Sequence, residues 1–190
     1  MENENDIKLV SNYLNGEEDA LKEIVQKYYK TIYRFLFNYI GGSPESADLT
    51  QEVFLKIWKK IKKYDKRHSF KTWIFTIARN TAIDFLRKKR NSVFSDFENV
   101  DGTNMLEENL SDDLPSASEV FSKIENAKKL KEELDRLPVI YKEVIMLKYQ
   151  EEMDFGEIST VLKRPEETVK SQHRRALIML RKNIDSSKFF

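Results

Sequence analysis

The segment 64–75 interleaves aromatic with basic side chains, and Lys66 and Arg67 lie between Tyr64 and Trp73. Aromatic rings stack on unpaired bases with about 1 to 3 kcal/mol per base, while cations follow the phosphate backbone. This composition therefore suits binding of a single nucleic-acid strand. Core packing is the alternative role for these rings, and for Trp73 the sequence leaves both roles open.

A second segment, 154–180, has the layout of a helix-turn-helix: a short helix, a break at 163–165, and a longer basic helix. Glu166 and Glu167 fall in the first turn of the longer helix, where the helix dipole favours carboxylates. At about 100° per residue, His173 shares a side with the apolar residues, so we expect it to pack rather than to bind or catalyse. The outward side chains suit phosphates and base edges, and they are Lys170, Ser171, Arg174 and Arg175. A plain amphipathic hairpin is the alternative.

Helices must position both segments, because apolar residues recur at spacings of three and four through most of the chain. We expect Ser43 to cap the second helix of the first group, with Pro44 at its first position. No strand-period segment is longer than a few residues. The expected helices cover residues 21–39, 44–61, 74–90, 124–137, 140–147, 155–162 and 166–180. The fold class is therefore all-α.

The charge distribution divides the chain into blocks, although the net charge is only +1. Residues 55–90 carry thirteen Lys or Arg against two Asp, and residues 163–182 carry seven against two Glu. Residues 91–122 between them contain eight acidic residues and no Lys or Arg. A single charged run is usually a solvated surface. Alternating blocks that coincide with the helical groups instead predict two basic domains joined by an acidic flexible linker.

Several classes of site are disfavoured by residues that the sequence lacks. It has no Cys and only two His, which disfavours disulfides and a structural metal, and we expect neither metal nor cofactor. No apolar stretch approaches the roughly 18 residues that span a bilayer, and the first residues lack a signal layout, so we expect a cytoplasmic protein without direct membrane insertion. No Gly-rich phosphate loop or nucleophile elbow occurs, so we expect neither an enzyme nor a small-molecule substrate.

Four stretches together resemble a known family: 48–58 (DLTQEVFLKIW), 69–80 (SFKTWIFTIARN), Leu137-Pro138, and 167–171 (ETVKS). They look like bacterial RNA polymerase sigma factors, and the presence of only a linker between the two domains is similar to the extracytoplasmic-function (ECF) subgroup. The resemblance implies a region 2-like bundle of three to four helices, a linker, and a region 4-like helix-turn-helix domain. We place these at residues 5–90, 91–119 and 120–185.

The resemblance also implies roles for individual residues. Docking on core polymerase is implied for Asp48, Gln51, Glu52 and Phe54. Recognition and melting of the minus-ten element is implied for Tyr64, Lys66, Arg67, Ser69, Phe70, Trp73 and Asn80. Recognition of the minus-thirty-five duplex is implied for Glu167, Thr168, Lys170, Ser171, Arg174 and Arg175. The acidic linker would enter the basic channels of the polymerase and later be displaced by RNA.

The sequence departs from the family pattern at the helix-turn-helix. Lys163 stands where the family usually has Gly, and a left-handed Lys costs about 1 kcal/mol, so we expect a turn of different shape. His173 and Arg174 also differ from the usual types. The base preference of relatives therefore does not carry over to this chain.

The expected function is promoter-specific transcription initiation, with core polymerase and promoter DNA as partners. Many family members are also held inactive by an anti-sigma factor. One alternative is a stand-alone helix-turn-helix regulator, which would bind duplex DNA without polymerase, usually as a dimer on a palindrome. Another is a helical protein-binding adaptor, which would show no salt-dependent DNA binding.

Overall fold

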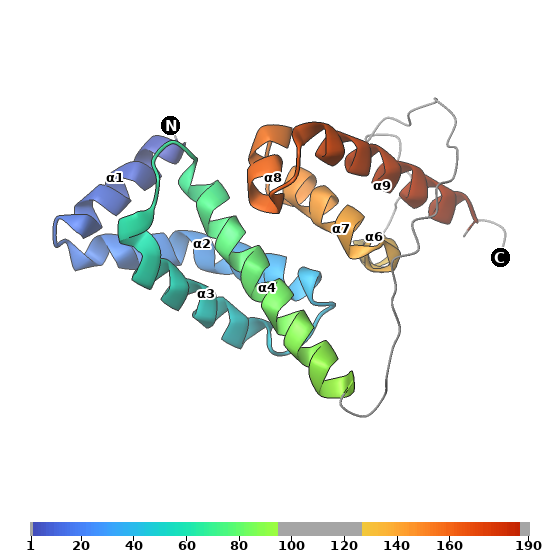
Figure 1. Cartoon of the computed structure of the whole chain (residues 1–190), viewed down its shortest axis with the longest axis horizontal. Helices are drawn as coiled ribbons and strands as arrows, with labels where there is room; N and C mark the ends of the chain where they lie inside the picture. The colour runs from blue at the N-terminus through green and yellow to red at the C-terminus, as the bar shows by residue number, and fades with distance from the viewer. Residues whose placement is uncertain (1, 95–126, 187–190) are drawn as a thin grey trace.

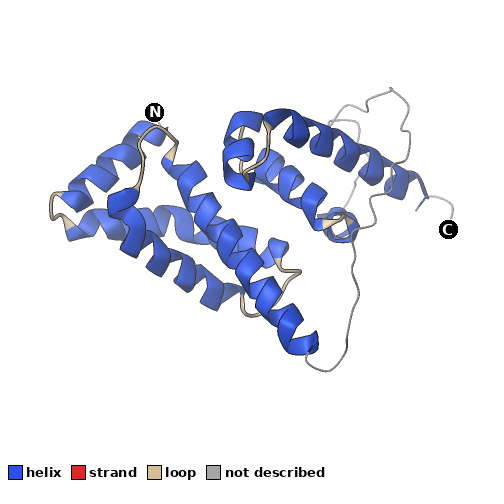
Figure 2. Cartoon of the chain, viewed as in Figure 1, coloured by secondary structure: helices blue, strands red, loops and turns tan. Residues whose placement is uncertain are grey.

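The computed structural model describes residues 2–94 and 127–186, and within these ranges every regular element is a helix (Figures 1 and 2). This confirms the all-α prediction. The expected acidic linker falls mostly on residues 95–126, which lie outside the described residues. In the part of the chain that is described, no helix is both long and apolar enough to span a bilayer.

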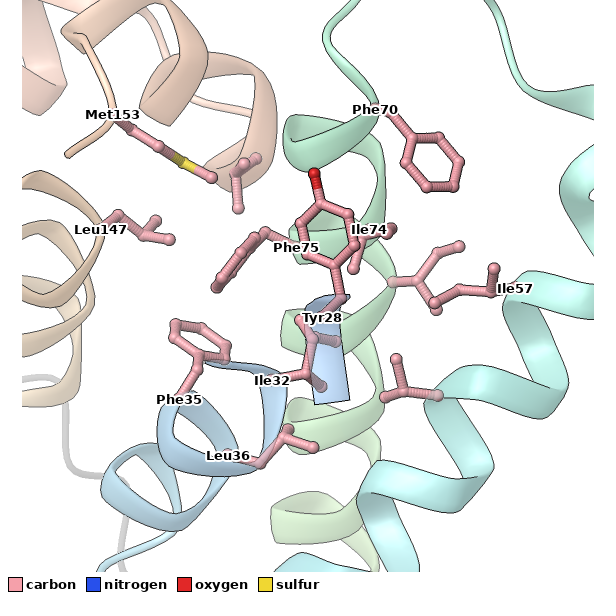
Figure 3. Packing of buried hydrophobic residues seen from close by; sticks show 14 of the residues in the cluster. Tyr28, Ile32, Phe35, Leu36, Ile57, Phe70, Ile74, Phe75, Leu147 and Met153 are labelled. Atoms are coloured by element: carbon pink, nitrogen blue, oxygen red, sulfur yellow. The ribbon is translucent and has the colours of Figure 1, made fainter. Parts of the chain in front are cut away.

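The N-terminal domain is a bundle whose long helix α4 (Phe70–Phe94) crosses the others (Figure 1). Helix α4 continues past residue 90, where the domain was expected to end. The remaining elements are listed in chain order: α1 (Glu2–Leu14), α2 (Glu18–Tyr39), α3 (Ser46–Lys60) and the short 3₁₀ helix η1 (Ile61–Lys63). The apolar stripes of α2, α3 and α4 meet in one core, as their spacing predicts (Figure 3).

Helix α1 was not among the expected helices. Its inward face carries Leu9 and Val10 but also Asp6, which is 1% exposed. Asp6 accepts a hydrogen bond from the Tyr28 hydroxyl at 2.5 Å and pairs with Lys27 Nζ at 2.6 Å. A buried acid interrupts the apolar stripe, and its compensating partners lie on another helix, so local spacing gave no signal.

The predicted cap of α3 is wrong. The helix begins at Ser46 with Glu45 as the N-cap residue, and Pro44 lies in the preceding turn. The Ser43 hydroxyl bonds the Glu45 side chain rather than a backbone N–H of the helix. The Ser43 carbonyl instead accepts from the Ser46 amide at 3.2 Å, which closes the turn.

The C-terminal domain ends in the expected pair of helices, α8 (Phe155–Leu162) and α9 (Glu166–Ser186), with α7 packed against α9. The elements that precede the pair are α6 (Ala127–Arg136), α7 (Val139–Ile145) and the π-helical turn η2 (Met146–Gln150). Asp154 caps α8 through a capping box. Its carboxylate accepts a hydrogen bond from the Glu157 amide at 2.7 Å, and the Glu157 carboxylate accepts one from the Asp154 amide at 3.1 Å.

The two domains pack directly against each other. Helix α8 lies along the N-terminal half of α4, and α7 approaches α2 (Figure 1). Leu147 and Met153 of the C-terminal domain face Phe35 and Phe75 of the N-terminal domain, and all four are buried in a continuous cluster (Figure 3). The sequence predicted two separate domains and gave no sign of this interface.

Candidate nucleic-acid interface

The loop before α4 is shaped by its own polar contacts. The Tyr64 hydroxyl donates to the His68 carbonyl at 2.7 Å, and the Asp65 carboxylate accepts the Arg67 amide at 3.0 Å and its guanidinium Nε at 2.7 Å. The hydrogen bonds from Arg67 lower the pKa of Asp65 to about 2. Lys66 and Arg67 remain exposed. The loop therefore presents two cations to solvent from an ordered turn.

Tyr64, Phe70 and Trp73 form one aromatic cluster behind this loop. Phe70 and Trp73 are stacked, with ring centroids 5.6 Å apart and planes at 26°, and Tyr64 meets Phe70 edge-on at 5.1 Å. Phe70 has no exposed surface, whereas Tyr64 and Trp73 are half-buried. Phe70 is thus a core residue in this conformation and supports Trp73, which stays partly accessible.

The two other predicted minus-ten residues differ in exposure. Asn80 is exposed on α4. The Ser69 hydroxyl accepts the Thr72 amide at 3.1 Å, which is the bond of a helix N-cap, and donates to Glu157 Oε1 of α8 at 3.0 Å. Ser69 therefore has a structural role at the start of α4 and is held by the C-terminal domain.

The residues predicted to dock on polymerase lie on α3. Asp48, Gln51 and Glu52 are exposed, and Phe54 is half-buried and stacked on Tyr29. Trp58 is 52% exposed and is therefore no core residue. Leu55, 53% exposed, was not singled out by the sequence analysis. Exposed apolar groups of this size beside carboxylates are typical of a protein-binding surface.

The turn of the helix-turn-helix keeps its ordinary backbone, contrary to our expectation. Lys163 adopts the left-handed conformation with φ 53° and ψ 47° and ends α8 as its C-cap residue. The Arg164 amide then donates a hydrogen bond to the Ser159 carbonyl at 3.2 Å, and the Ser159 hydroxyl donates one to the Arg164 carbonyl at 2.6 Å. These bonds offset the strain that Gly would avoid, so the chain tolerates Lys here.

The second helix of this motif, α9, turns most of its predicted duplex-contacting side chains outward. Arg174 is half-buried, and the others are exposed: Glu167, Thr168, Lys170, Ser171 and Arg175. Lys170 also pairs with Glu166 and Glu167 in the first turn, at 3.0 and 2.9 Å. The exposed face is therefore polar and partly basic, as recognition of a duplex requires.

His173 packs on the inner side of α9, as predicted. Its Nε2 lies 2.9 Å from the Tyr149 hydroxyl, and its ring meets Phe155 edge-on at 5.3 Å. Burial lowers the His173 pKa, and the nearby Lys148 lowers it further. No group of acidic, His or Cys side chains that could hold a metal occurs among the described residues.

A buried ionic network joins the turn before α9 to α4 and α2. The sequence did not predict it. Glu143 of α7, 1% exposed, bonds Arg79 Nε at 2.8 Å, Arg164 at 2.7 Å and the Tyr39 hydroxyl at 3.0 Å. Burial acts against the charged form of Arg79, but the hydrogen bond and charge of Glu143 outweigh it and raise the Arg79 pKa. No local pattern marks Glu143, because its partners come from three other parts of the chain.

Comparisons with known proteins agree with this architecture. The family model described as Sigma-70 region 2 matches residues 24–92, and the one described as Sigma-70, region 4 matches residues 127–180. The chain is 31% identical over 179 residues to the ECF RNA polymerase sigma factor SigW of Bacillus subtilis strain 168, covering 93% of this chain and 95% of SigW. It is 28% identical over 171 residues to SigX of the same strain, covering 88% and 85%.

Solved structures show the same fold. CnrH in complex with the cytosolic domain of CnrY matches with a TM-score of 0.69 at 18% identity, covering 96% of this chain and 98% of that chain. RpoE in complex with the anti-sigma factor NepR from Bartonella quintana matches with a TM-score of 0.65 at 20% identity, covering 85% of this chain and 94% of that chain.

The chain belongs to the sigma-70 family, in the ECF subgroup. Its function is promoter-specific initiation of transcription in association with RNA polymerase.

Proposed function

We propose that this chain directs core polymerase to promoters through three separate surfaces and contributes no catalytic group of its own. The observation that carries this proposal is the exposed polar face of α9, the second helix of the helix-turn-helix. Strand opening then draws on binding free energy, since flipping and unstacking a base costs a few kcal/mol. We place this activity in the cytoplasm, where the polymerase acts.

The docking surface is α3, where Asp48, Gln51 and Glu52 are exposed beside the half-buried Phe54. The carboxylates suit a basic partner surface, and the apolar groups supply buried area. We include Trp58 in this surface because its indole Nε1 donates to the Tyr13 hydroxyl at 2.7 Å, which fixes the ring while half of it stays exposed.

The minus-ten surface comprises the loop 64–68 with Trp73 and Asn80. Lys66 and Arg67 supply cations for the strand, and Trp73 supplies a ring on which an unpaired base can stack. Tyr64 and Phe70 support that ring from behind. Ser69 fixes the start of α4 that carries it.

The minus-thirty-five surface is the outer face of α9. Arg174 and Arg175 are suited to base edges and phosphates, and Ser171 and Thr168 to either. Glu167 is suited to accept a hydrogen bond from cytosine or to orient Lys170, with which it pairs. An anti-sigma factor is a further partner that we propose for this chain, since RpoE of Bartonella quintana is described with one.

The docking assignment is tested by charge reversal on α3. In Asp48→Lys/Glu52→Lys we expect the affinity for core polymerase to fall at least about tenfold, because like charges brought together in an interface cost several kcal/mol. Glu23→Lys, a charge reversal at an exposed position of α2, is the matched control. Co-sedimentation with purified core enzyme and run-off transcription measure the effect. Unchanged core binding by the double variant contradicts the assignment.

A further inference from the structure

Helix α4, which carries Trp73, is capped at its start by two residues from different parts of the chain. The first amides of a helix have no acceptor within it. The Ser69 hydroxyl accepts a hydrogen bond from the Thr72 amide at 3.1 Å, as a local cap does. The Phe70 amide instead donates to Asn3 Oδ1 of α1 at 3.2 Å, and Figure 1 shows the start of α1 beside the start of α4. Helix α1 therefore closes the end of α4 from a distant part of the sequence.

Helix α1 also holds the loop that precedes α4. Lys66 Nζ donates to the Ser11 hydroxyl of α1 at 3.2 Å. Asn3 and Ser11 are eight residues apart, which corresponds to about 12 Å along a helix at about 1.5 Å per residue. The segment 66–70 is therefore attached to α1 at two well-separated points.

A buried acid fixes α1 on the bundle. Asp6 is 1% exposed, and its carboxylate binds the Tyr28 hydroxyl and Lys27 of α2. A buried carboxylate is stable only beside compensating groups, so Asp6 favours one position of α1 on α2. The Tyr28 ring meets Phe70 edge-on, with centroids 6.0 Å apart, and Phe70 stacks on Trp73. A continuous series of contacts thus leads from α1 to Trp73.

Helix α1 lies outside both segments that the family models match, since the first of these begins at residue 24. Its apolar residues Leu9 and Val10 complete the core. Asn3 is exposed and adds nothing to that core, so its hydrogen bond acts on the position of the first turn of α4. A role in the core alone does not account for this contact.

We propose that α1 is a positioning element for the minus-ten surface, in which Asn3 and Ser11 hold the loop and the first turn of α4 in the conformation that lets Trp73 receive an unpaired base. The hold of α1 on the loop depends on no proposed residue role, whereas its effect on promoter DNA rests on the proposed function of Trp73. When a binding conformation is populated only part of the time, the apparent affinity is reduced by that fraction. Helix α1 therefore raises the affinity for an opened strand by ordering the residues that bind it.

The first test measures how firmly Trp73 is held in the free chain. The chain has two tryptophans, so Trp58→Phe leaves Trp73 as the single fluorophore of this kind. In this background we expect Asn3→Ala to raise acrylamide quenching of the Trp73 emission. Asn3→Asp keeps an oxygen acceptor for the Phe70 amide and should restore the lower value. Asn5→Ala, at an exposed asparagine of the same helix, is the matched control. Quenching in Asn3→Ala equal to that in the control overturns the proposal.

The second test uses the holoenzyme and a labelled single strand that carries the mapped minus-ten sequence. We expect Asn3→Ala to weaken strand binding by about threefold to tenfold, which is the size of one lost helix cap. Ser11→Ala should weaken it less, because Lys66 keeps its charge. Asn3→Asp should bind the strand like the wild type, and none of these variants should change binding to core polymerase. An equal loss of strand and core binding without rescue by Asn3→Asp shows that α1 only stabilises the fold, and it overturns the proposal.

Trp73→Ala separates a failure of this inference from a failure of the proposed function. If Trp73→Ala weakens strand binding and Asn3→Ala does not, positioning by α1 is rejected and the proposed function stands. If Trp73→Ala binds the strand like the wild type, the proposed role of Trp73 is rejected. The quenching values then decide the hold of α1 on their own: a rise in Asn3→Ala that Asn3→Asp reverses supports it, and no rise overturns it.

Discussion

Helices α4 and α9 differ in how many of their polar side chains are bound by the rest of the chain. Ser69, which caps α4, and Lys71 and Arg79 on the helix itself are all bound by the C-terminal domain. On α9, Ser171 and Arg175 stay exposed to solvent. The chain therefore covers one side of α4, the helix proposed to bind the opened strand, and leaves the outer face of α9, the helix proposed to bind the duplex, exposed to solvent.

The largest expected effect comes from removing the Glu143 carboxylate, which pairs with Arg79 of α4 and with Arg164 before α9. Glu143→Ala leaves Arg79 and Arg164 without their shared counter-charge, and breaking a buried pair from one side typically costs about 3 to 5 kcal/mol. We expect the free energy of unfolding in urea to fall by that amount. Glu132→Ala, exposed on α6, is the control. A loss no larger than that of the control contradicts the network.

Trp73 tests the region on α4, and Trp58, the second tryptophan of the chain, serves as its comparison on α3. Trp73→Ala should weaken strand opening by about 1 to 3 kcal/mol, since one stacked base is lost. Trp58→Ala, on the exposed face of α3, should instead lower core binding. Run-off transcription on duplex and pre-melted templates distinguishes them, because a pre-melted template should rescue only Trp73→Ala. Equal activity of Trp73→Ala on both templates speaks against a melting role.

The open region is tested at Arg174. Arg174→Ala should weaken binding of the holoenzyme to a duplex minus-thirty-five element by about 1 to 3 kcal/mol if the guanidinium contacts a base. Arg181→Ala, exposed farther along α9, should change binding little. Anisotropy with matched and substituted duplexes measures the effect. A similar loss on every sequence shows that Arg174 contacts phosphate only.

A smaller effect is expected at the turn between α8 and α9. Lys163→Gly relieves a left-handed non-glycine residue and should raise the free energy of unfolding by up to about 1 kcal/mol. Glu152, with φ 55°, is a second position of the same kind, and Glu152→Gly should give a comparable gain. Thermal melting followed by circular dichroism checks both. A lower melting temperature for both variants shows that the Lys and Glu side chains stabilise the turns by more than the left-handed backbone strain destabilises them.

The smallest effect is a pH dependence from His173. Its pKa is lowered below the ordinary value of 6.5, so the folded state favours the neutral ring. The resulting stability is complete above pH 6.5 and declines as pH falls below that value, since the unfolded chain binds the proton first. His173→Gln should remove this part of the decline, which urea unfolding at several pH values measures. An identical pH profile in the variant rules out His173 as its source.

Elements with regular apolar spacing followed from the sequence, and elements fixed by distant partners did not. The stripes of α2, α4 and α8 were predicted because each buries one continuous face. Helix α1 was missed because Asp6 interrupts its stripe and is compensated from α2. The start of α3 was misplaced because Ser43 bonds a side chain instead of a backbone amide.

The candidate site divides in the same way. The exposure of Arg175 followed from the sequence, because outward positions on a helix are set by its period. Lys66 and Asn80 were named only through the family resemblance, and both are exposed. The burial of Phe70 did not, since an aromatic side chain beside cations suits both a core and a base. Only the packing of Tyr28, Tyr64 and Trp73 around it shows that it belongs to the core.

The sequence by itself determined an all-helical chain with a helix-turn-helix and two basic segments, because helix period, turn residues and charge blocks are local properties. The resemblance of its motifs to sigma factors then indicated the family. The tertiary structure alone decided that the two domains dock and that Glu143 holds three partners at once. The reason is that a buried carboxylate is stable only where separate parts of the chain bring compensating groups to it, and no local spacing encodes that meeting.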